Sequence, residues 1–185
     1  MNKKNFLIKW YYHPEISYND YSLELYVDKI NICEFMINDK IEKTYDDLYF
    51  IVEWFEENLE FITNIDEFPF KVKGNSGVEI LDNSYLIDWD INKNEKELNK
   101  QWKWNSRHNL RSIGPKGFYP YVVFRRKNNK IEVSWENKDL FKEYGVVFIN
   151  QKGVSFVEIK EFEEEVIRFI KDVRKVGETV RLKLM

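Results

Sequence analysis

The chain has 185 residues and a mass of 22.6 kDa, a size typical of a single domain. Hydrophobic residues make up 43% of it and aromatic residues 17%, which excludes an intrinsically disordered chain. Its net charge of −3 and pI of about 5.6 argue against a dedicated nucleic-acid-binding protein, and its single cysteine excludes an intramolecular disulfide and a cysteine-based zinc site. We therefore expect one domain over residues 1–185, without long linkers.

The N-terminal part alternates between apolar and polar residues. This pattern predicts a first strand from Phe6 to Trp10 and a hairpin or meander between residues 21 and 37. Cys33 lies among apolar residues of the second segment, so we expect a buried, unreactive thiol. Charged residues interrupt the first apolar run, and no window is long enough to span a bilayer. We expect neither a signal peptide nor membrane association, and we place the protein in the cytoplasm.

Residues 45–63 have the apolar spacing of an amphipathic helix, and Thr44 with Asp47 resembles a capping box at its start. The opposite face is acidic. We expect this face to be solvated, and the sequence leaves open whether it also binds a partner. The apolar side chains expected to be buried are Leu48, Ile51, Val52, Phe55 and Leu59.

The segment after Pro69 is predicted to form short strands separated by turns, and then a second helix over residues 94–111 that ends at Gly114. We expect Trp102 to anchor this helix on the sheet. The predicted strands cover residues 70–73, 78–81 and 85–89.

The last third of the chain contains the strongest hairpin signal, two alternating runs around the polar residues 127–130. We also expect a strand pair joined through Gly153, a third helix over residues 161–176 and a closing strand through residues 179–184. Because strands mostly follow one another by tight turns, the sequence predicts an α+β fold of antiparallel sheets with three packed helices. The predicted hairpin joins residues 121–126 to 131–135, and the predicted strand pair joins residues 146–149 to 154–159.

Charge is distributed unevenly along the chain. Residues 1–100 carry 21 acidic and 11 basic side chains, whereas residues 101–185 carry 11 acidic and 18 basic ones. No aspartate or glutamate occurs between Leu98 and Ile131. Cations with interleaved aromatic rings in this segment are the groups that a phosphate-bearing or acidic partner would need.

Six residues of this segment are candidates for binding an anion or an acidic partner. A short loop between the second helix and the hairpin could bring them together, and Arg107 and Arg111 lie one turn apart on the helix. The charge that offsets these cations could be a partner's carboxylates, a phosphate, or acidic residues of this chain. The candidates are Trp104, Arg107, His108, Arg111, Arg125 and Arg126.

No complete catalytic motif is present, and we expect no cofactor. Neither His13 nor His108 has a second ligand at a metal-binding spacing. Glu158 and Lys160 match the Glu-x-Lys part of metal-dependent nucleases, but no aspartate lies on the strand before them. We therefore expect a protein that is not an enzyme.

A set of aromatic, basic, glycine and proline positions extends from residue 102 to residue 135. It comprises Trp102, Trp104, Arg107, His108, Leu110, Arg111, Gly114, Pro120, Val123 to Arg126 and Glu132 to Trp135. This pattern resembles a segment in the N-terminal region of larger bacterial proteins that carry a zinc metallopeptidase domain of the ImmA/IrrE class after it. The chain lacks the His-Glu-x-x-His motif of that domain. The resemblance implies a non-catalytic sensing or interaction module of a bacterial stress or phage-defence system.

Two classes of function follow from these observations. The first is a cytoplasmic protein that binds another protein, as an immunity, inhibitor or accessory factor in a bacterial conflict system. The second is nucleic-acid binding through residues 100–130, or nucleic-acid cleavage with Glu158 and Lys160. The sequence indicates neither the partner nor the oligomeric state.

Overall fold

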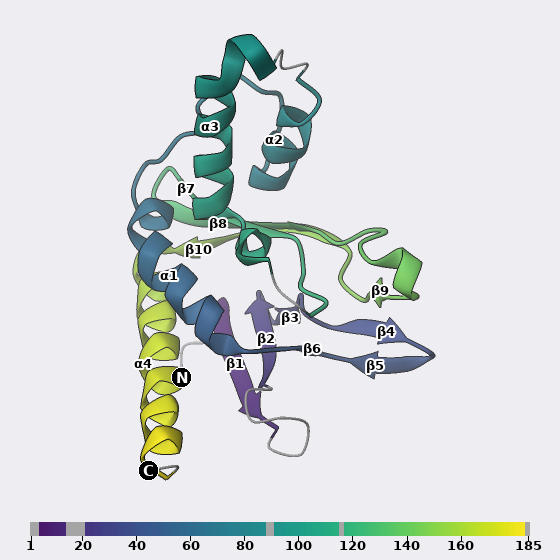
Figure 1. Ribbon diagram of the computed structural model, residues 1–185, viewed down its shortest axis with the longest axis vertical. Coiled ribbons are helices and arrows are strands. Elements are labelled where there is room, and N and C mark those ends of the chain that lie inside the picture. The colour runs from purple at the N-terminus through teal and green to yellow at the C-terminus, as the bar shows by residue number, and fades with distance from the viewer. Residues whose placement is uncertain (1–3, 14–20, 88–90, 115–116, 184–185) are drawn as a thin grey trace.

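The computed structural model describes residues 4–13, 21–87, 91–114 and 117–183, and it has the predicted α+β architecture (Figure 1). The described residues form three small sheets, and all strand pairs in them are antiparallel. The first sheet contains β1 (Phe6–Tyr12), β2 (Tyr21–Val27), β3 (Ile30–Asn31) and β6 (Thr44–Asp46). The second contains β7 (Val122–Lys127), β8 (Lys130–Glu136) and β10 (Lys152–Glu158), and the third contains β4 (Phe35–Ile37), β5 (Lys40–Glu42) and β9 (Val147–Phe148).

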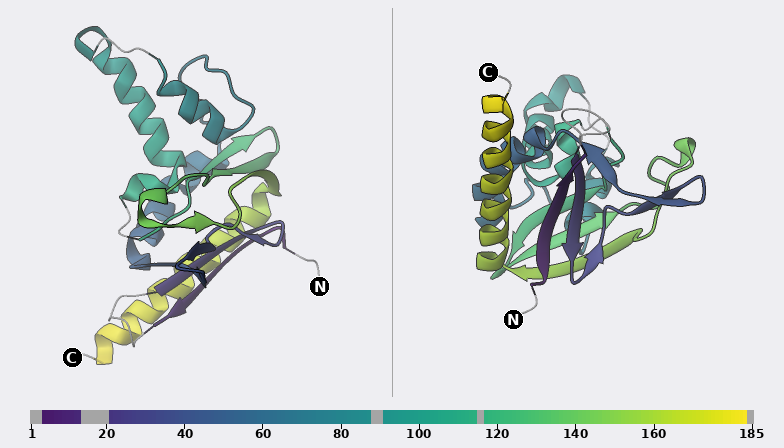
Figure 2. Two further views of the ribbon diagram at one scale, coloured as in Figure 1. Left: turned by 90° about the vertical axis from the view of Figure 1, so that its right-hand side faces the viewer. Right: turned by 90° about the horizontal axis from the view of Figure 1, so that it is seen from below.

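Helices cover the two larger sheets. Figure 2 shows α4 running along one side of the molecule, with the β4–β5 hairpin projecting on the other. The α-helices are α1 (Leu48–Thr63), α2 (Gly77–Ser84), α3 (Ile91–His108) and α4 (Ile159–Lys183), and the 3₁₀ helices are η1 (Leu110–Ile113) and η2 (Lys142–Tyr144). None of the helices in the described ranges is long and apolar enough to cross a membrane.

The main core lies where α1 and α4 pack against the first two sheets. Phenylalanine rings from four elements meet there, and the rings of Phe6 and Phe162 are 4.7 Å apart between centroids. The buried face predicted for α1 is confirmed, with Leu59 only half-buried. Cys33 is also buried as predicted, and burial raises the pKa of its thiol to about 12.

Three predictions are corrected: the start of a helix, a closing strand and the pairing of two strands. The helix expected from residue 45 begins at Leu48, because Thr44 belongs to β6 and Asp47 alone caps the helix by accepting a hydrogen bond from the Tyr49 amide. The expected closing strand is wrong, since α4 continues through Lys183, and Leu184 lies outside the described residues. The expected pair of strands around Gly153 is also wrong, because β9 pairs with β4 while β10 pairs with β8.

The strands expected over residues 70–73, 78–81 and 85–87 are wrong, and this difference affects the site; residues 88 and 89 of the last one lie outside the described residues. Residues 70–73 have no regular structure, residues 77–84 form α2, and residues 85–87 form a turn. Ser76 caps α2 by accepting from the Glu79 amide, and the Glu79 carboxylate accepts from the Asn75 amide 2.9 Å away. This reciprocal capping makes a helix out of a segment whose apolar residues alone resemble a strand.

The inward face of α3 also differs from the expected one. Trp102 does not anchor the helix, since 63% of its surface is exposed. Gln101, Trp104 and His108 are buried instead, because α2 and the segment that precedes it cover that side. The unpredicted helix α2 therefore decides which side of α3 faces inward.

The outer edge of β1 is closed by α4. The Glu161 carboxylate accepts hydrogen bonds from the amides of Asn5 and Phe6, and Glu165 accepts from the Ile8 amide at 2.8 Å. Arg168 donates to the Ile8 carbonyl. Side chains of one helix thus satisfy backbone groups in the first part of β1 that an edge strand would otherwise present to other strands.

Candidate functional site

Asp66 is the point at which three of the predicted site residues meet. Its carboxylate lies 3.2 Å from the Arg107 guanidinium and 3.1 Å from Nε2 of His108, and its backbone carbonyl accepts a hydrogen bond from the Trp104 indole at 3.0 Å. The side-chain hydrogen bond to His108 and the neighbouring cation Arg107 hold the pKa of Asp66 below its usual value. The α3 residues and the segment after α1 are held together by this one aspartate.

His108 is buried between two acceptors. Its Nδ1 lies 2.7 Å from the Phe124 carbonyl and its Nε2 faces the Asp66 carboxylate, while its ring stacks on Trp104 at 4.3 Å between centroids. The carbonyl and the carboxylate both accept hydrogen bonds, so each ring nitrogen of His108 faces an acceptor. His108 therefore joins β7, α3 and the Asp66 segment.

Glu132 is a fully buried carboxylate beside the same segment. Arg125, its cross-strand neighbour, binds it with Nε at 3.1 Å and Nη2 at 2.8 Å, and the Lys127 ammonium lies 3.4 Å away. The Gly77 amide, at the first turn of α2, also donates to Glu132 at 2.5 Å. The carboxylate thereby fixes the N-terminus of α2 on the second sheet.

The approach of α2 to the sheet requires glycine at position 77. A Cβ atom there would lie 2.7 Å from Cγ1 of Val123 and 3.2 Å from the Ser134 hydroxyl. Both neighbours are fully buried and have no room to move away. Gly77 thus allows the helix to come close enough for its amide to reach Glu132.

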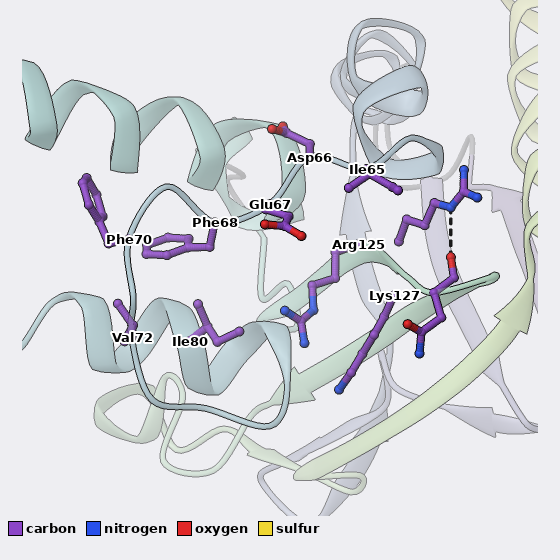
Figure 3. A pocket seen from close by; sticks show the side chains of 11 residues that line it. Ile65, Asp66, Glu67, Phe68, Phe70, Val72, Ile80, Arg125 and Lys127 are labelled. Atoms are coloured by element: carbon purple, nitrogen blue, oxygen red, sulfur yellow. Dashed lines mark hydrogen bonds between the residues drawn. The ribbon is translucent and has the colours of Figure 1, made fainter.

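A cavity of about 390 Å³ opens between α2, the segment 65–72 and the end of β7. Figure 3 shows its two halves: Phe68, Phe70, Val72 and Ile80 on one side, and Arg125 and Lys127 pointing into the other. The Asp66 carboxylate points away from Arg125, in keeping with its contacts to Arg107 and His108. We call this cavity the arginine pocket; the other residues that line it are Ile65, Asp66, Glu67, Arg126 and Asn128.

The structure brings five of the six predicted site residues to the segment that follows α1. Trp104, Arg107 and His108 bind Asp66, whereas Arg125 and Arg126 line the arginine pocket. Arg126 donates to the carbonyl of Thr63, at the C-terminus of α1, and to that of Asn128. Several of the predicted binding residues therefore also brace the fold.

Arg111 lies elsewhere. Its guanidinium is 4.9 Å from the Phe141 ring centroid, and among the described residues its buried Nε has no hydrogen-bond partner. Burial lowers the pKa of this guanidinium. It is not part of the group around Asp66.

The residues weighed for metal chemistry are separated and paired with other side chains. Glu158 binds Lys130 at 2.8 Å, Lys160 lies 3.8 Å from Glu164, and His13 lies 2.9 Å from the Ser22 hydroxyl. Within the part of the chain that the structure describes, no group of three or more histidine, cysteine, aspartate or glutamate side chains could hold a metal ion.

Sequence reasoning missed the two carboxylates that organise this region. Glu132 could have been found from the sequence, because the predicted hairpin places it directly opposite Arg125. Asp66 gave no local signal, since its partners lie 41 and 42 residues away along the chain. The pair Ser76 and Glu79 was a readable capping signal for α2.

The chain was compared with protein-family models, with curated proteins and with solved structures, and no match was found in any of the three.

Proposed function

We propose that this chain is a non-catalytic interaction protein that binds an acidic segment of a partner protein in the arginine pocket. The observation that carries the proposal is that the pocket has an apolar wall on one side and, on the other, arginines with nitrogens that make no hydrogen bond to a described residue. An acidic side chain or C-terminal carboxylate next to an apolar side chain complements both halves.

The charge balance of the pocket favours an anion. Arg125, Arg126 and Lys127 contribute three positive charges, which Glu132 and the exposed Glu67 offset only in part. The contacts of Arg126 are two backbone carbonyls, and no described carboxylate pairs with it. Asp66 also lines the pocket, but Arg107 pairs with it and offsets its charge. One positive charge therefore remains in excess.

The hydrogen bonds that the guanidinium groups already make also favour an anion as the ligand. Arg125 uses Nε and Nη2 for Glu132, and Arg126 uses Nε and Nη1 for backbone carbonyls. One terminal nitrogen of each arginine makes no hydrogen bond to a described residue. Each of these free nitrogens can donate a charge-assisted hydrogen bond to a carboxylate oxygen.

The apolar wall supplies the second part of the recognition. Ile65 is 72% exposed at the rim, and the rings of Phe68 and Phe70 stand edge to face at 5.8 Å. A cavity of this volume lies within the range that holds a ligand of drug-like size. One or two residues of a peptide would fill it.

The resemblance to the N-terminal region of ImmA/IrrE-type proteins supplies the biological setting of the proposal. We place the module in a bacterial stress or phage-defence system, in the cytoplasm, as an immunity, inhibitor or accessory protein. Its partner would then carry the activity that this chain lacks.

Peptide display tests the proposal directly. We expect selection from a random library to enrich peptides with aspartate, glutamate or a free carboxylate beside an apolar residue. Fluorescence polarisation should then give a dissociation constant that rises more than tenfold for Ile65→Glu, which adds a negative charge at the rim. The matched control is Ile41→Glu on β5, an isoleucine exposed to 65%. Equal binding by both variants, or enrichment of peptides without acidic groups, would contradict the proposal.

Nucleic-acid binding is the second candidate, and α3 favours it. Trp102 is exposed beside Lys103, and a ring next to cations can stack on a base while the cations bind phosphate. A mobility shift with short DNA and RNA that weakens steeply with salt and is lost in Trp102→Ala would support this reading.

A further inference from the structure

Two helices carry oppositely charged rows with the same spacing. Glu53, Glu57 and Glu60 follow one another on α1 at intervals of four and three residues. Lys96, Lys100 and Lys103 follow one another on α3 at the same intervals. Such intervals place each set in one line along its helix, about 10 Å long at a rise of about 1.5 Å per residue. We call these the glutamate row and the lysine row.

The charges of both rows are largely unused within the chain. No described cation forms an ion pair with any member of the glutamate row, although Glu56, on another side of α1, binds Arg174. In the lysine row, the only ion pair among described residues joins Lys100 to Glu97 on the same helix. Both rows are therefore available to an outside partner.

The rows converge where the two helices meet. Arg107, one turn beyond Lys103, lies over the ring of Phe61 at 3.9 Å from its centroid, and Phe61 follows Glu60. The Trp54 indole donates to the Ser106 carbonyl at 2.7 Å across the same junction. Figure 1 shows α3 extending from the region in which α1 ends. A single partner can therefore contact both rows.

Each row is accompanied by an exposed aromatic ring. Phe50, one turn before Glu53, is 53% exposed, and Trp102, beside Lys103, is 63% exposed. Large aromatic side chains provide most of the apolar burial at protein interfaces, whereas charged rows fix the register. Charge and apolar surface thus occur together on both helices.

We propose that a second copy of this chain binds here, with the glutamate row of each copy on the lysine row of the other. A two-fold axis near the junction of α1 and α3 uses both rows twice, as an isologous interface requires. Nucleic acid is disfavoured as the occupant because phosphates that approach the lysine row also meet the glutamate row. An acidic protein is disfavoured for the same reason, whereas a second copy complements both rows.

Sedimentation velocity over 10 to 500 µM protein, values typical of weak association, tests this inference. We expect a dimer at 50 mM NaCl whose dissociation constant rises more than tenfold at 500 mM, since exposed charges are screened. A lysine-row variant (Lys96→Glu, Lys100→Glu, Lys103→Glu) and a glutamate-row variant (Glu53→Lys, Glu57→Lys, Glu60→Lys) should each be monomeric. An equimolar mixture should form a heterodimer, because every contact is again between opposite charges.

The control carries Lys160→Glu and Lys171→Glu, two exposed lysines of α4, and should dimerise like the wild type. A wild-type protein that stays monomeric at low salt overturns the inference. A dimer whose dissociation constant does not change with salt concentration also overturns it. Row variants that dimerise alone, or that fail to associate when mixed while circular dichroism shows both folded, also overturn it. If a row variant does not fold, the mixture of Lys100→Glu with Glu57→Lys gives the same comparison with smaller changes, because the middle members of the two rows face each other in either orientation of the rows.

Discussion

Glu165 and Glu132 are both fully buried carboxylates that face guanidinium groups, yet their surroundings differ. Glu165 binds Arg168, Lys4 at 2.6 Å and the Ile8 amide, and Arg168 in turn binds Asp172 and the Ile8 carbonyl. Burial by itself would raise the pKa of Glu165, but these partners outweigh it and hold the pKa below its usual value. The two contacts with Ile8 tie α4 to the edge of β1.

Glu132 instead lies among more cations than it can offset. Arg125 and Lys127 both reach it, Arg126 follows between them in sequence, and a cavity borders the group. One terminal nitrogen of Arg125 and one of Arg126 make no hydrogen bond to a described residue. A cavity of about 250 Å³ also borders Arg168 and Ile8, but all three guanidinium nitrogens of Arg168 make hydrogen bonds. We therefore expect a buried ion pair to belong to a binding site only where donor nitrogens beside a cavity are left without partners.

Replacing Glu132 by alanine should have the largest effect. It leaves the Gly77 amide and the mostly buried Arg125 guanidinium without their partner, so we expect a loss of about 3 to 5 kcal/mol in urea denaturation. The double variant Glu132→Leu, Arg125→Met should recover much of this loss, because no buried charge remains. A loss below about 1 kcal/mol in the single variant would mean that Glu132 does not hold α2.

Replacing Glu165 by alanine should cost less, about 2 kcal/mol, because its partners Lys4 and Arg168 are partly exposed and can turn to solvent. The difference from the wild type should depend on pH. A carboxylate with a lowered pKa stabilises the fold above its unfolded pKa of about 4.3, and this contribution disappears as pH falls through the folded pKa. Denaturation between pH 2.5 and 6 measures it, and a difference independent of pH would contradict the pairing.

Asp66→Asn should reduce the free energy of unfolding by about 1 kcal/mol, since Asp66 is partly exposed. Because the pKa of Asp66 is lowered in the folded state, the difference from wild type is full above the unfolded pKa of about 3.9 and is lost as pH falls through the folded pKa. The groups that face Asp66 are Arg107 and His108, so Arg107→Met should abolish part of this pH dependence. Unchanged pH dependence in that variant would assign the shift to His108 alone.

Ile65→Glu and Trp102→Ala should have the smallest effects on stability, within about 0.5 kcal/mol, since both side chains are mostly exposed. Thermal denaturation checks this result. It is required for the binding tests, because a loss of binding is informative only when the folded fraction is unchanged.

Local patterns predicted the elements that depend on their own residues. The helix α1, the β7–β8 hairpin and the buried face of α1 are confirmed because apolar spacing and turn chemistry suffice to specify them. The segment 70–89 was wrong because its short apolar runs fit a strand, whereas the capping pair Ser76 and Glu79 and the contact with Glu132 decide for helix.

The candidate site was also predicted only in part. Its arginines lie on predicted elements, but their neighbours come from the irregular segment after α1, which has no periodicity. Trp102 was assigned to the wrong side of α3 because α2, the helix that covers the buried side, was itself missed. Whether Arg107, Arg111, Arg125 and Arg126 bind a partner stays a prediction.

The closure of the β1 edge also has a consequence for synthesis on the ribosome. β1 is made more than 150 residues before Glu161, Glu165 and Arg168, whose side chains bind backbone groups on its outer edge. During that interval the nascent chain carries an open strand edge, which pairs readily with other unfolded chains. Translation speed and chaperone occupancy during this interval should therefore govern the yield of native protein more than the stability of the finished fold does.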